Sequence, residues 1–332
     1  MSEPSPPVLF ASGSSSRPPT DPAPARGTGA APSPASELPL DQVRTLLAVV
    51  DEGTFEAAAA VLHVTPSAVS QRVKALEQRT GRVLLLRTKP VRPTESGQVL
   101  VRLARQVGLL ERDAHAELGL SGTGRATRVP VAVNADSLAS WFLPALGRVP
   151  PEARICFELR REDEGHTAAL LREGTVMAAV TSSPEPVPGC SVRHLGRMRY
   201  LPVAHPDFTA RHLDGPLREV LPAAPVIVFD RLDDIQDSFV RRVTRGRSGA
   251  SADRHWIPTS EGYADAVAAG LGWGMVPEAQ AVPLLRAGRV VRFAPQLQVD
   301  VSLYWQQWKL DSPALAALAQ AVTATAAEEL RP

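Results

Sequence analysis

The segment Pro66–Thr80 offers side chains that could contact a nucleic acid. Apolar Val69, Val73 and Leu76 recur at intervals of four and three residues, which predicts a helix with one buried stripe. The opposite face carries hydroxyl, amide and ammonium groups, on Ser67, Ser70, Gln71, Lys74 and Gln78. Such groups hydrogen-bond base edges and phosphates, so this face is a candidate for the major groove of DNA. Arg72 falls beside the buried stripe, and we expect it to flank that groove or to pair locally.

A second candidate contact follows the apolar run at residues 83–86. Arg87, Lys89 and Arg92 place three cations around Pro90, which predicts a hairpin with a basic tip. Cations bind phosphate without reading sequence, so the hairpin is expected to lie as a wing against the DNA backbone. The alternative is a generic three-helix core with a solvated polar face, and it leaves the basic hairpin unexplained.

A third set of polar residues follows the predicted strands of the remaining chain and could bind a small molecule, because ligands of open α/β folds lie beyond the carboxyl ends of strands. The residues at such ends are Asp136, Ser137, Asp163, Thr181, Asp230 and Ser260. A basic amino acid would suit them, with Ser137 and helix N–H groups at its carboxylate. Asp136, Asp163 and Asp230 are then expected at its cationic groups. Each residue could instead cap a helix or lie in a solvated loop.

Catalytic and metal-binding patterns are absent from the sequence. It contains no Gly-x-Ser-x-Gly elbow, no phosphate-binding GxxxxGK[ST] loop and no His-x-x-x-His pair. Two cysteines, Cys156 and Cys190, are too few for a disulfide framework, which favours a reducing cytoplasm. No apolar run approaches the ~20 residues that span a bilayer. The sequence therefore predicts a cytoplasmic protein that is not an enzyme, needs no cofactor or metal and does not enter a membrane.

The elements that must position the first polar face are short helices with clear ends. Thr65 is a natural N-cap, and Pro66 occupies the first helical position, where its missing N–H costs nothing. Gly81 is placed to end the helix in a left-handed conformation. Upstream, residues 55–62 show an i, i+3, i+4, i+7 apolar stripe, so the segment Phe55–Lys74 is expected to be a helix-turn-helix.

The order of these features is similar to that of a known family. The stretch TPSAVSQRVKALE at residues 65–77 and the segment LLLRTKPVRPTESG at residues 84–97 resemble the winged helix-turn-helix of LysR-type transcriptional regulators. The second segment is similar to the ArgP/LysG branch, which implies a regulator that senses basic amino acids and controls their export. The resemblance covers roughly residues 40–330. It implies an all-α winged helix-turn-helix domain, a long linker helix and a two-lobed α/β effector domain resembling periplasmic binding proteins.

A long helix is expected to follow the wing over residues 94–120. Its apolar residues alternate at three and four positions like the seam of a coiled coil, and they are Leu100, Leu103, Val107, Leu110 and Ala114. The seam predicts pairing with a second copy, which would place two recognition helices on an interrupted palindromic DNA site. Packing of the helix onto its own domain is the alternative.

After a hinge at residues 121–128, strands and helices alternate. The order β-α-β-α-β from Val129 to Thr181 predicts a parallel sheet covered by helices. With the resemblance, the pattern divides the effector domain 129–332 into lobe I, about 129–200 and 300–332, and lobe II, about 201–299. The winged domain is expected at residues 38–93. Residues 1–37 are rich in Pro, Ser, Ala and Gly and are predicted to form a disordered tail.

These patterns favour a dimeric or tetrameric transcriptional regulator that binds double-stranded DNA and a small effector. Lysine or arginine is the expected effector, and RNA polymerase is a candidate partner. A net charge of +1 argues against coating of nucleic acid by charge alone. The alternative is an architectural or replication-associated DNA-binding protein without effector control. A solute-binding protein for transport is opposed by the N-terminal winged domain.

Overall fold

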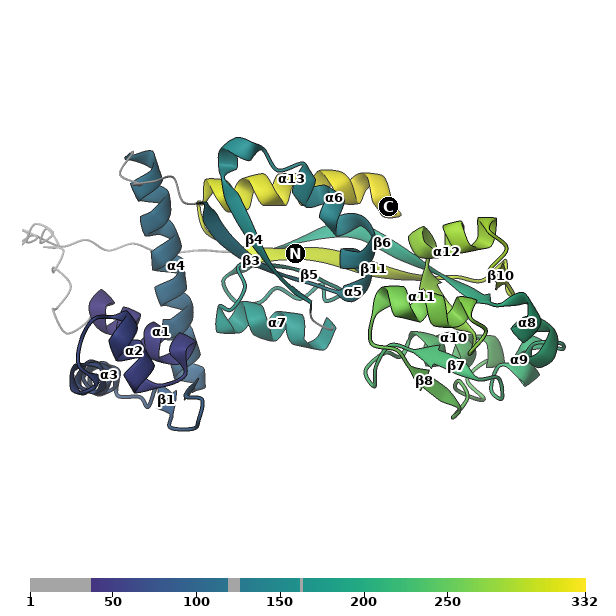
Figure 1. Cartoon of the computed structure of the whole chain (residues 1–332), viewed down its shortest axis with the longest axis horizontal. Coiled ribbons are helices and arrows are strands. Elements are labelled where there is room, and N and C mark those ends of the chain that lie inside the picture. The colour runs from purple at the N-terminus through teal and green to yellow at the C-terminus, as the bar shows by residue number, and fades with distance from the viewer. Residues whose placement is uncertain (1–36, 119–125, 162–163) are drawn as a thin grey trace, which may run out of the picture. The chain divides into compact units, whose positions relative to one another are not determined.

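The computed structural model describes residues 37–118, 126–161 and 164–332 (Figure 1). The predicted tail apart from Glu37, most of the predicted hinge, and Asp163 lie outside the described residues. The chain divides into residues 1–37 and a compact unit, Leu38–Pro332, which contains the elements described below.

Three helices open the N-terminal domain, as the sequence predicts. Their bounds are α1 Leu40–Glu52, α2 Phe55–Val61 and α3 Pro66–Thr80. The Thr65 hydroxyl caps α3 by accepting a hydrogen bond from the Ala68 N–H at 3.2 Å, and Gly81 ends the helix with a φ of 63°. The predicted apolar stripe of α3 is buried and its polar face is exposed. The predicted helix, its two ends and its orientation are confirmed.

A two-stranded hairpin follows α3 and pairs β1 Leu85–Leu86 with β2 Arg92–Pro93 in antiparallel register. In its loop, the Val91 N–H donates to the Gly53 carbonyl at 2.8 Å. Gly53 is the C-cap of α1 and has a φ of 73°, a conformation that glycine adopts without strain. The hairpin is therefore anchored to the end of α1, and the position of its basic loop is fixed relative to the three helices.

Helix α4 Glu95–Glu117 begins where the sequence predicts, but its predicted seam is only partly free. Leu100 is 7% exposed and belongs to the core of the N-terminal domain, and Leu103 packs against that core. The alternative of packing onto its own domain therefore holds for the first turns of α4, which lie against α1. Val99 and Leu110 remain 54% and 42% exposed, so an outer apolar stripe is still available.

A seven-stranded mixed sheet forms the centre of lobe I and extends into lobe II. Its strands are β3 Thr127–Val133, β4 Ile155–Arg161, β5 Ala178–Thr181, β6 Cys190–Ala204, β9 Gly274–Pro277, β10 Val291–Arg292 and β11 Val299–Trp308. Strand β3 pairs in parallel with β4 and β5, which confirms the predicted parallel order. Strand β11 runs antiparallel to β5 and β6, so the complete sheet is mixed. Strand β6 continues into lobe II, where it pairs with β9 and β10.

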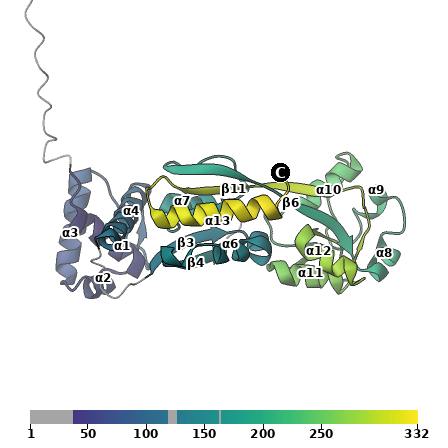
Figure 2. The same cartoon turned by 90° about the horizontal axis from the view of Figure 1, so that it is seen from above.

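Helices cover the sheet of lobe I. Figure 1 shows α13 Pro313–Glu329 above the strands and α7 Glu164–Glu173 below them, and Figure 2 shows α13 running alongside β11. The helical segment after β3 comprises α5 Ala135–Ser137, a π-helical turn Leu138–Phe142 and α6 Leu143–Gly147. This segment starts at the carboxyl end of β3, where the sequence analysis expects a ligand.

Lobe II is built from short elements. Its helices and strands are α8 Pro206–His212, α9 Leu217–Val220, β7 Val226–Val228, α10 Ile235–Thr244, β8 Arg254–Trp256, α11 Ser260–Ala268 and α12 Glu278–Arg286. Two Arg254 nitrogens lie 2.8 and 3.0 Å from the two Asp237 oxygens, an ion pair that ties β8 to α10 and lowers the pKa of Asp237. Helices α8, α9, α10 and α12 were not predicted from the sequence, and they depend on tertiary packing more than on local propensity.

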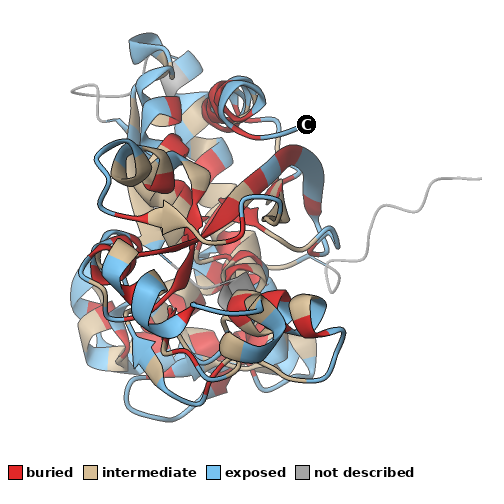
Figure 3. Ribbon diagram, turned by 90° about the vertical axis from the view of Figure 1, so that its right-hand side faces the viewer, coloured by how far each residue is buried: buried red, intermediate tan, exposed pale blue. Residues whose placement is uncertain are grey.

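The fold class is confirmed as a winged helix-turn-helix domain, a long helix and a two-lobed α/β region. Figure 3 shows buried residues concentrated on the strands and on the inner faces of the helices. Among the described helices, none is both long and apolar enough to cross a bilayer.

Candidate DNA-binding groove and effector cavity

A groove of about 840 Å³ lies between α3 and the hairpin. The predicted contact residues that line it are Ser67, Ser70, Gln71, Lys74, Arg87 and Lys89. Thr65 and Pro66 lie exposed at the start of α3. Arg72 is half-buried and Arg92 is exposed, and neither is among the described residues that line the groove. A polar helix face and a basic hairpin thus border one hollow, as a winged helix-turn-helix that docks on DNA requires.

The groove also contains three acidic residues, Glu52, Glu56 and Glu77. The Glu77 carboxylate accepts a hydrogen bond from the Leu84 N–H at 2.8 Å, so it joins α3 to the hairpin. The three carboxylates equal in number the three cations of the groove, so its lining has no formal excess charge. Such a groove favours recognition by hydrogen bonds over attraction by charge alone.

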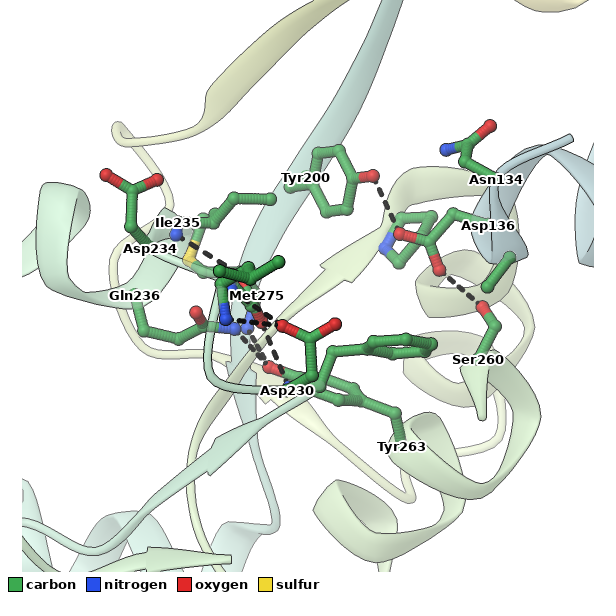
Figure 4. A pocket seen from close by; sticks show the side chains of 15 residues that line it. Asn134, Asp136, Tyr200, Asp230, Asp234, Ile235, Gln236, Ser260, Tyr263 and Met275 are labelled. Carbon is green, nitrogen blue, oxygen red and sulfur yellow. Dashed lines mark hydrogen bonds between the residues drawn. The ribbon is translucent and has the colours of Figure 1, made fainter. Parts of the chain in front are cut away.

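A second hollow, a cavity of about 370 Å³, lies where the two lobes meet (Figure 4). Its lining residues are Asn134, Ala135, Asp136, Tyr200, Phe229, Asp230, Leu232, Asp233, Asp234, Ile235, Gln236, Ser260, Tyr263, Met275 and Pro277. They come from both lobes and from β6, which joins the lobes. The lining contains four aspartates, and none of its described residues is Lys, Arg or His. Such a lining suits a cationic ligand.

Asp136 stands in the first turn after β3, and both its oxygens accept hydrogen bonds (Figure 4). Oδ2 accepts from the Tyr200 hydroxyl at 2.7 Å, and Oδ1 accepts from the Ser260 hydroxyl at 2.5 Å. Burial raises the pKa of Asp136 above its ordinary value, and the charge of Glu261 adds to the rise. The two hydrogen bonds oppose this rise only in part. A cation in the cavity would stabilise the ionised carboxylate.

Asp233 is a second carboxylate of the cavity, and the sequence analysis missed it. Its Oδ2 accepts from the Phe229 N–H at 3.0 Å, and its Oδ1 accepts from the Ile235 N–H at 3.2 Å. Burial raises the pKa of Asp233, and the charge of Asp136 raises it further. The sequence contained a usable signal, because the rule that selected Asp230 at the end of a strand applies to the whole loop 230–234, in which three of the five residues are aspartate.

Asp230 lines the cavity as predicted, and it also shapes the loop that follows β7. Its Oδ1 accepts hydrogen bonds from the Leu232 N–H at 2.6 Å and from the Asp233 N–H at 2.9 Å. This turn, in which a side chain replaces a backbone acceptor, holds Asp233 at the cavity. Of the other predicted effector residues, Asp136 and Ser260 also line the cavity.

The structure does not place Ser137 and Thr181 at the cavity, in contrast to the prediction. Ser137 is fully buried, because successive side chains on a helix point about 100° apart and the segment that turns Asp136 to the cavity turns Ser137 into the core. Thr181 ends β5, and its hydroxyl accepts from the Ser183 N–H at 3.1 Å. It stabilises the turn after the strand. Asp163 lies outside the described residues.

A buried network behind the aspartates fixes one wall of the cavity. Gln236 donates from Nε2 to the Tyr263 hydroxyl at 2.8 Å. That hydroxyl donates to the Ile227 carbonyl at 2.9 Å and accepts from the Met275 N–H at 3.1 Å. Burial raises the pKa of Tyr263, so the phenol stays neutral. The network joins α10, α11 and β9, and no periodicity in the sequence indicates it.

Two side-chain oxygens of residues that line the cavity, Asn134 Oδ1 and Gln236 Oε1, are left without a partner among the described residues. Asn134 is 7% exposed, and its Oδ1 makes no hydrogen bond to any described residue. A buried carbonyl oxygen without a donor is costly, and a ligand that brings an N–H group would satisfy it. Within residues 37–118, 126–161 and 164–332, no group of three His, Cys, Asp or Glu side chains is placed to hold a metal ion.

Two sequence profiles match the chain. The profile described as a bacterial regulatory helix-turn-helix protein of the lysR family matches residues 40–98, which include the groove. The profile described as a LysR substrate binding domain matches residues 123–327, which include the cavity.

Two named transcriptional regulators have sequences similar to this chain. The HTH-type transcriptional regulator LysG of Mycobacterium tuberculosis is 48% identical over 286 residues, which are 86% of this chain and 92% of that protein. The lysine export transcriptional regulatory protein LysG of Corynebacterium glutamicum is 44% identical over 297 residues, 88% and 99% of the two chains.

Two solved structures are similar to this chain over most of its length. ArgP from Mycobacterium tuberculosis has a TM-score of 0.83 at 47% identity, covering 89% of this chain and 99% of that one. Full-length LysG from Corynebacterium glutamicum with bound effector Arg has a TM-score of 0.76 at 42% identity, covering 89% and 100%.

Proposed function

Because this chain belongs to the LysR family of bacterial transcriptional regulators, it is a DNA-binding regulator and not an enzyme, and we propose that a basic amino acid controls it. Lysine and arginine are the proposed effectors, and export of a basic amino acid is the proposed target process. The Corynebacterium glutamicum relative supports this proposal, because its name includes lysine export and its structure holds arginine. The match to a substrate binding domain gives no support to an architectural DNA-binding protein.

The charge of the cavity carries the effector proposal. Four aspartates line it, without a basic side chain among the described lining residues. Asp136 and Asp233 have raised pKa values because they are buried, so an ammonium or guanidinium group would convert a costly burial into an ion pair. The Asn134 oxygen offers a further acceptor for an N–H of the effector.

The carboxylate of the effector is proposed to face helix starts. Helix α11 and the helical segment after β3 both begin at the cavity, with Ser260 and Ala135 among the lining residues. Helix N-termini carry partial positive charge and N–H groups without intrahelical partners, which favour a carboxylate. These backbone groups take the role that the sequence analysis gave to the Ser137 hydroxyl.

An effector at Asp136 would act on the contact between the lobes. Asp136 belongs to lobe I and Ser260 to α11 of lobe II, and their hydrogen bond joins the two. A cation that engages Asp136 competes with this bond and so favours a different spacing of the lobes. Leu109 of α4 is fully buried in the core of lobe I. Helix α4 would therefore transmit the change in lobe spacing to the winged domain.

The winged domain is proposed to act in pairs on an interrupted palindromic DNA site, in a dimer or tetramer. The outer stripe of α4, with Val99, Val107, Leu110 and Ala114, is the proposed contact between copies, because Val99 and Leu110 are exposed apolar residues at heptad-like spacing. A cytoplasmic location and contact with RNA polymerase follow from this role as proposals.

Replacement of Lys89 by Ala should weaken binding to operator and to random DNA by the same factor. Lys89 is exposed in the wing, and a phosphate contact carries no sequence information. The slope of log affinity against log salt concentration should fall in magnitude by about one. Fluorescence anisotropy over a salt series measures both quantities. Lys309→Ala, on lobe I, is the control and should leave the slope unchanged. A loss confined to operator DNA would contradict the phosphate role.

Titration calorimetry with the full-length protein tests the effector. Lysine or arginine should bind at least about 30-fold more tightly than norleucine, because norleucine lacks the side-chain cation that a buried carboxylate requires. All three share the α-amino and α-carboxylate groups, so the comparison isolates the charge. Norleucine binding as tightly as lysine, or neither cationic amino acid binding at all, would refute the proposal.

A further inference from the structure

The hydrogen bonds around Asp136 point to a second ligand of the cavity, a proton. Asp136 Oδ1 lies 2.5 Å from Ser260 Oγ, and Ser260 Oγ lies 3.2 Å from Gln280 Oε1. When Asp136 is ionised, the serine hydroxyl holds the single hydrogen of this chain of three oxygens, because carboxylate and amide oxygens only accept. One hydrogen cannot serve two contacts. A proton on Asp136 supplies the second, since Asp136 then donates to Ser260 and Ser260 donates to Gln280. The competing arrangement is a rotated Gln280 amide whose Nε2 donates to Ser260, and it needs no proton on Asp136.

We propose that the effector-free cavity holds this proton on Asp136, and that a cationic effector displaces it into solvent on binding. The inference rests on the proposed basic amino-acid effector. Protonation breaks no existing contact, because Oδ2 of Asp136 accepts from the Tyr200 hydroxyl in either state. The effector brings its own positive charge and N–H donors, so the departing proton leaves an ionised carboxylate that is paired.

Asp233 is a less suitable place for the proton. Both of its oxygens accept hydrogen bonds from backbone N–H groups, those of Phe229 and Ile235. A backbone N–H cannot become an acceptor, so a proton on Asp233 would displace one of these donors. The Ser260 hydroxyl can rotate and accept. The two carboxylates influence each other, and the shared proton resides mainly on Asp136.

The charges that face Asp136 also favour a proton. The titratable groups nearest to it or lining the cavity are Tyr200 from β6, Asp230, Asp233 and Asp234 from the loop after β7, and Glu261 and Tyr263 from α11. On α12, Glu278 is paired with Arg331 at 2.7 Å, and on β6, Arg199 is paired with Asp300 at 2.9 Å. Burial raises the pKa of Asp136, which agrees with the hydrogen count.

Lysine binding should therefore release a proton and strengthen as pH rises. Below the raised pKa of Asp136, affinity should grow up to about tenfold per pH unit, and above it the affinity should level off. Calorimetry in buffers of different ionisation enthalpy, over a pH series that extends from below to above the raised pKa, gives the number of protons released per lysine. Release should approach one at the acidic end and fall towards zero at the alkaline end. Lysine binding without proton exchange anywhere in this range would overturn the inference and leave the proposed effector intact.

Gln280→Leu tests the chain of oxygens directly. This change removes the oxygen that accepts from Ser260, so a proton on Asp136 is no longer favoured by that contact. The curve of protons released per lysine against pH should therefore move to lower pH, while lysine still binds at the alkaline end. A release curve that stays in place would overturn the hydrogen count.

A measurement without effector keeps the inference testable even if lysine does not bind. A carboxyl group whose pKa is raised by folding holds its proton more tightly in the folded state. Folding stability then falls as pH rises from the ordinary aspartate pKa, about 3.9, to the raised one. Asp233 and the ion-paired carboxylates add their own pH dependence, so the test is a difference between proteins. In chemical denaturation, the stability of the natural protein relative to Asp136→Asn should fall over this pH range, whereas its stability relative to Asp214→Asn, an exposed control, should stay constant. Parallel curves for all three proteins would overturn the inference.

Discussion

Asp136→Asn should lower the affinity for lysine by about 30-fold to 1,000-fold, which corresponds to about 2–4 kcal/mol for the loss of one partner of a buried charge pair. Asparagine keeps the size of the side chain, so the cavity should keep its shape. Its single oxygen can accept from one of the two hydroxyls, and its amide group meets the other, which rotates to accept from it. The negative charge is removed. Calorimetry at mildly alkaline pH, where the natural carboxyl is ionised, measures the effect.

Two comparisons make the result specific to the charge. Asp214→Asn removes an exposed carboxylate of lobe II that does not line the cavity, and its lysine affinity should match that of the natural protein. In Asp136→Asn, the preference for lysine over norleucine should shrink towards the value of an uncharged site. A variant that keeps the full preference would show that Asp136 is not a partner of the side-chain ammonium group.

Gln71→Ala should reduce the discrimination between operator and random DNA by about 1–3 kcal/mol, as expected for a side chain that contacts a base edge. Gln71 is exposed on α3 and lines the groove beside Lys74, at a place where a helix in the major groove meets base edges. The measurement is a competition between the two DNAs, followed by mobility shift or anisotropy at one salt concentration.

Gln78 provides the matched control, because it lies exposed on the same helix but is not among the described residues that line the groove. Gln78→Ala should change the discrimination by less than about 0.5 kcal/mol. If Gln71→Ala weakens binding to both DNAs equally, Gln71 contacts the DNA backbone instead of a base edge. If both variants lose discrimination equally, the face of α3 that contacts base edges extends to Gln78, towards the end of the helix.

The DNA-binding half could be predicted closely because its determinants are local. The i, i+4, i+7 stripe of α3, the Thr65 cap and the Gly81 end all act within a few residues, so the sequence determines which face is buried. The exposed polar face then follows, and with it the side chains available to DNA. The placement of the wing is less local, since it depends on the bond between Val91 and the end of α1.

The effector site could be predicted only in part. The rule that ligands bind at the carboxyl ends of strands selected Asp136, Asp230 and Ser260, which the structure places around one cavity. The same rule selected Ser137 and Thr181, which are not among the described residues that line this cavity, because the rule does not specify which way a side chain points. It missed Asp233, which the turn built by Asp230 holds in place.

For helix α4 too, the sequence predicts one feature and the tertiary structure decides another. The spacing of its apolar residues correctly predicts a helix with an apolar seam, but it does not specify which surface covers that seam. The tertiary structure buries Leu100 in the winged domain and Leu109 in lobe I, and leaves Val99 and Leu110 exposed.

By itself, then, the sequence determined the helices of the winged domain, their polar face and the alternation of strands and helices, because periodicity and caps act over one or two turns. Only the tertiary structure decided that Asp136, Asp233 and Ser260 meet at one cavity without a basic partner among its described lining residues, because they lie far apart along the chain and meet only when the lobes fold. The same long-range folding set the pKa values of the two aspartates, since burial depends on neighbours that local sequence does not reveal.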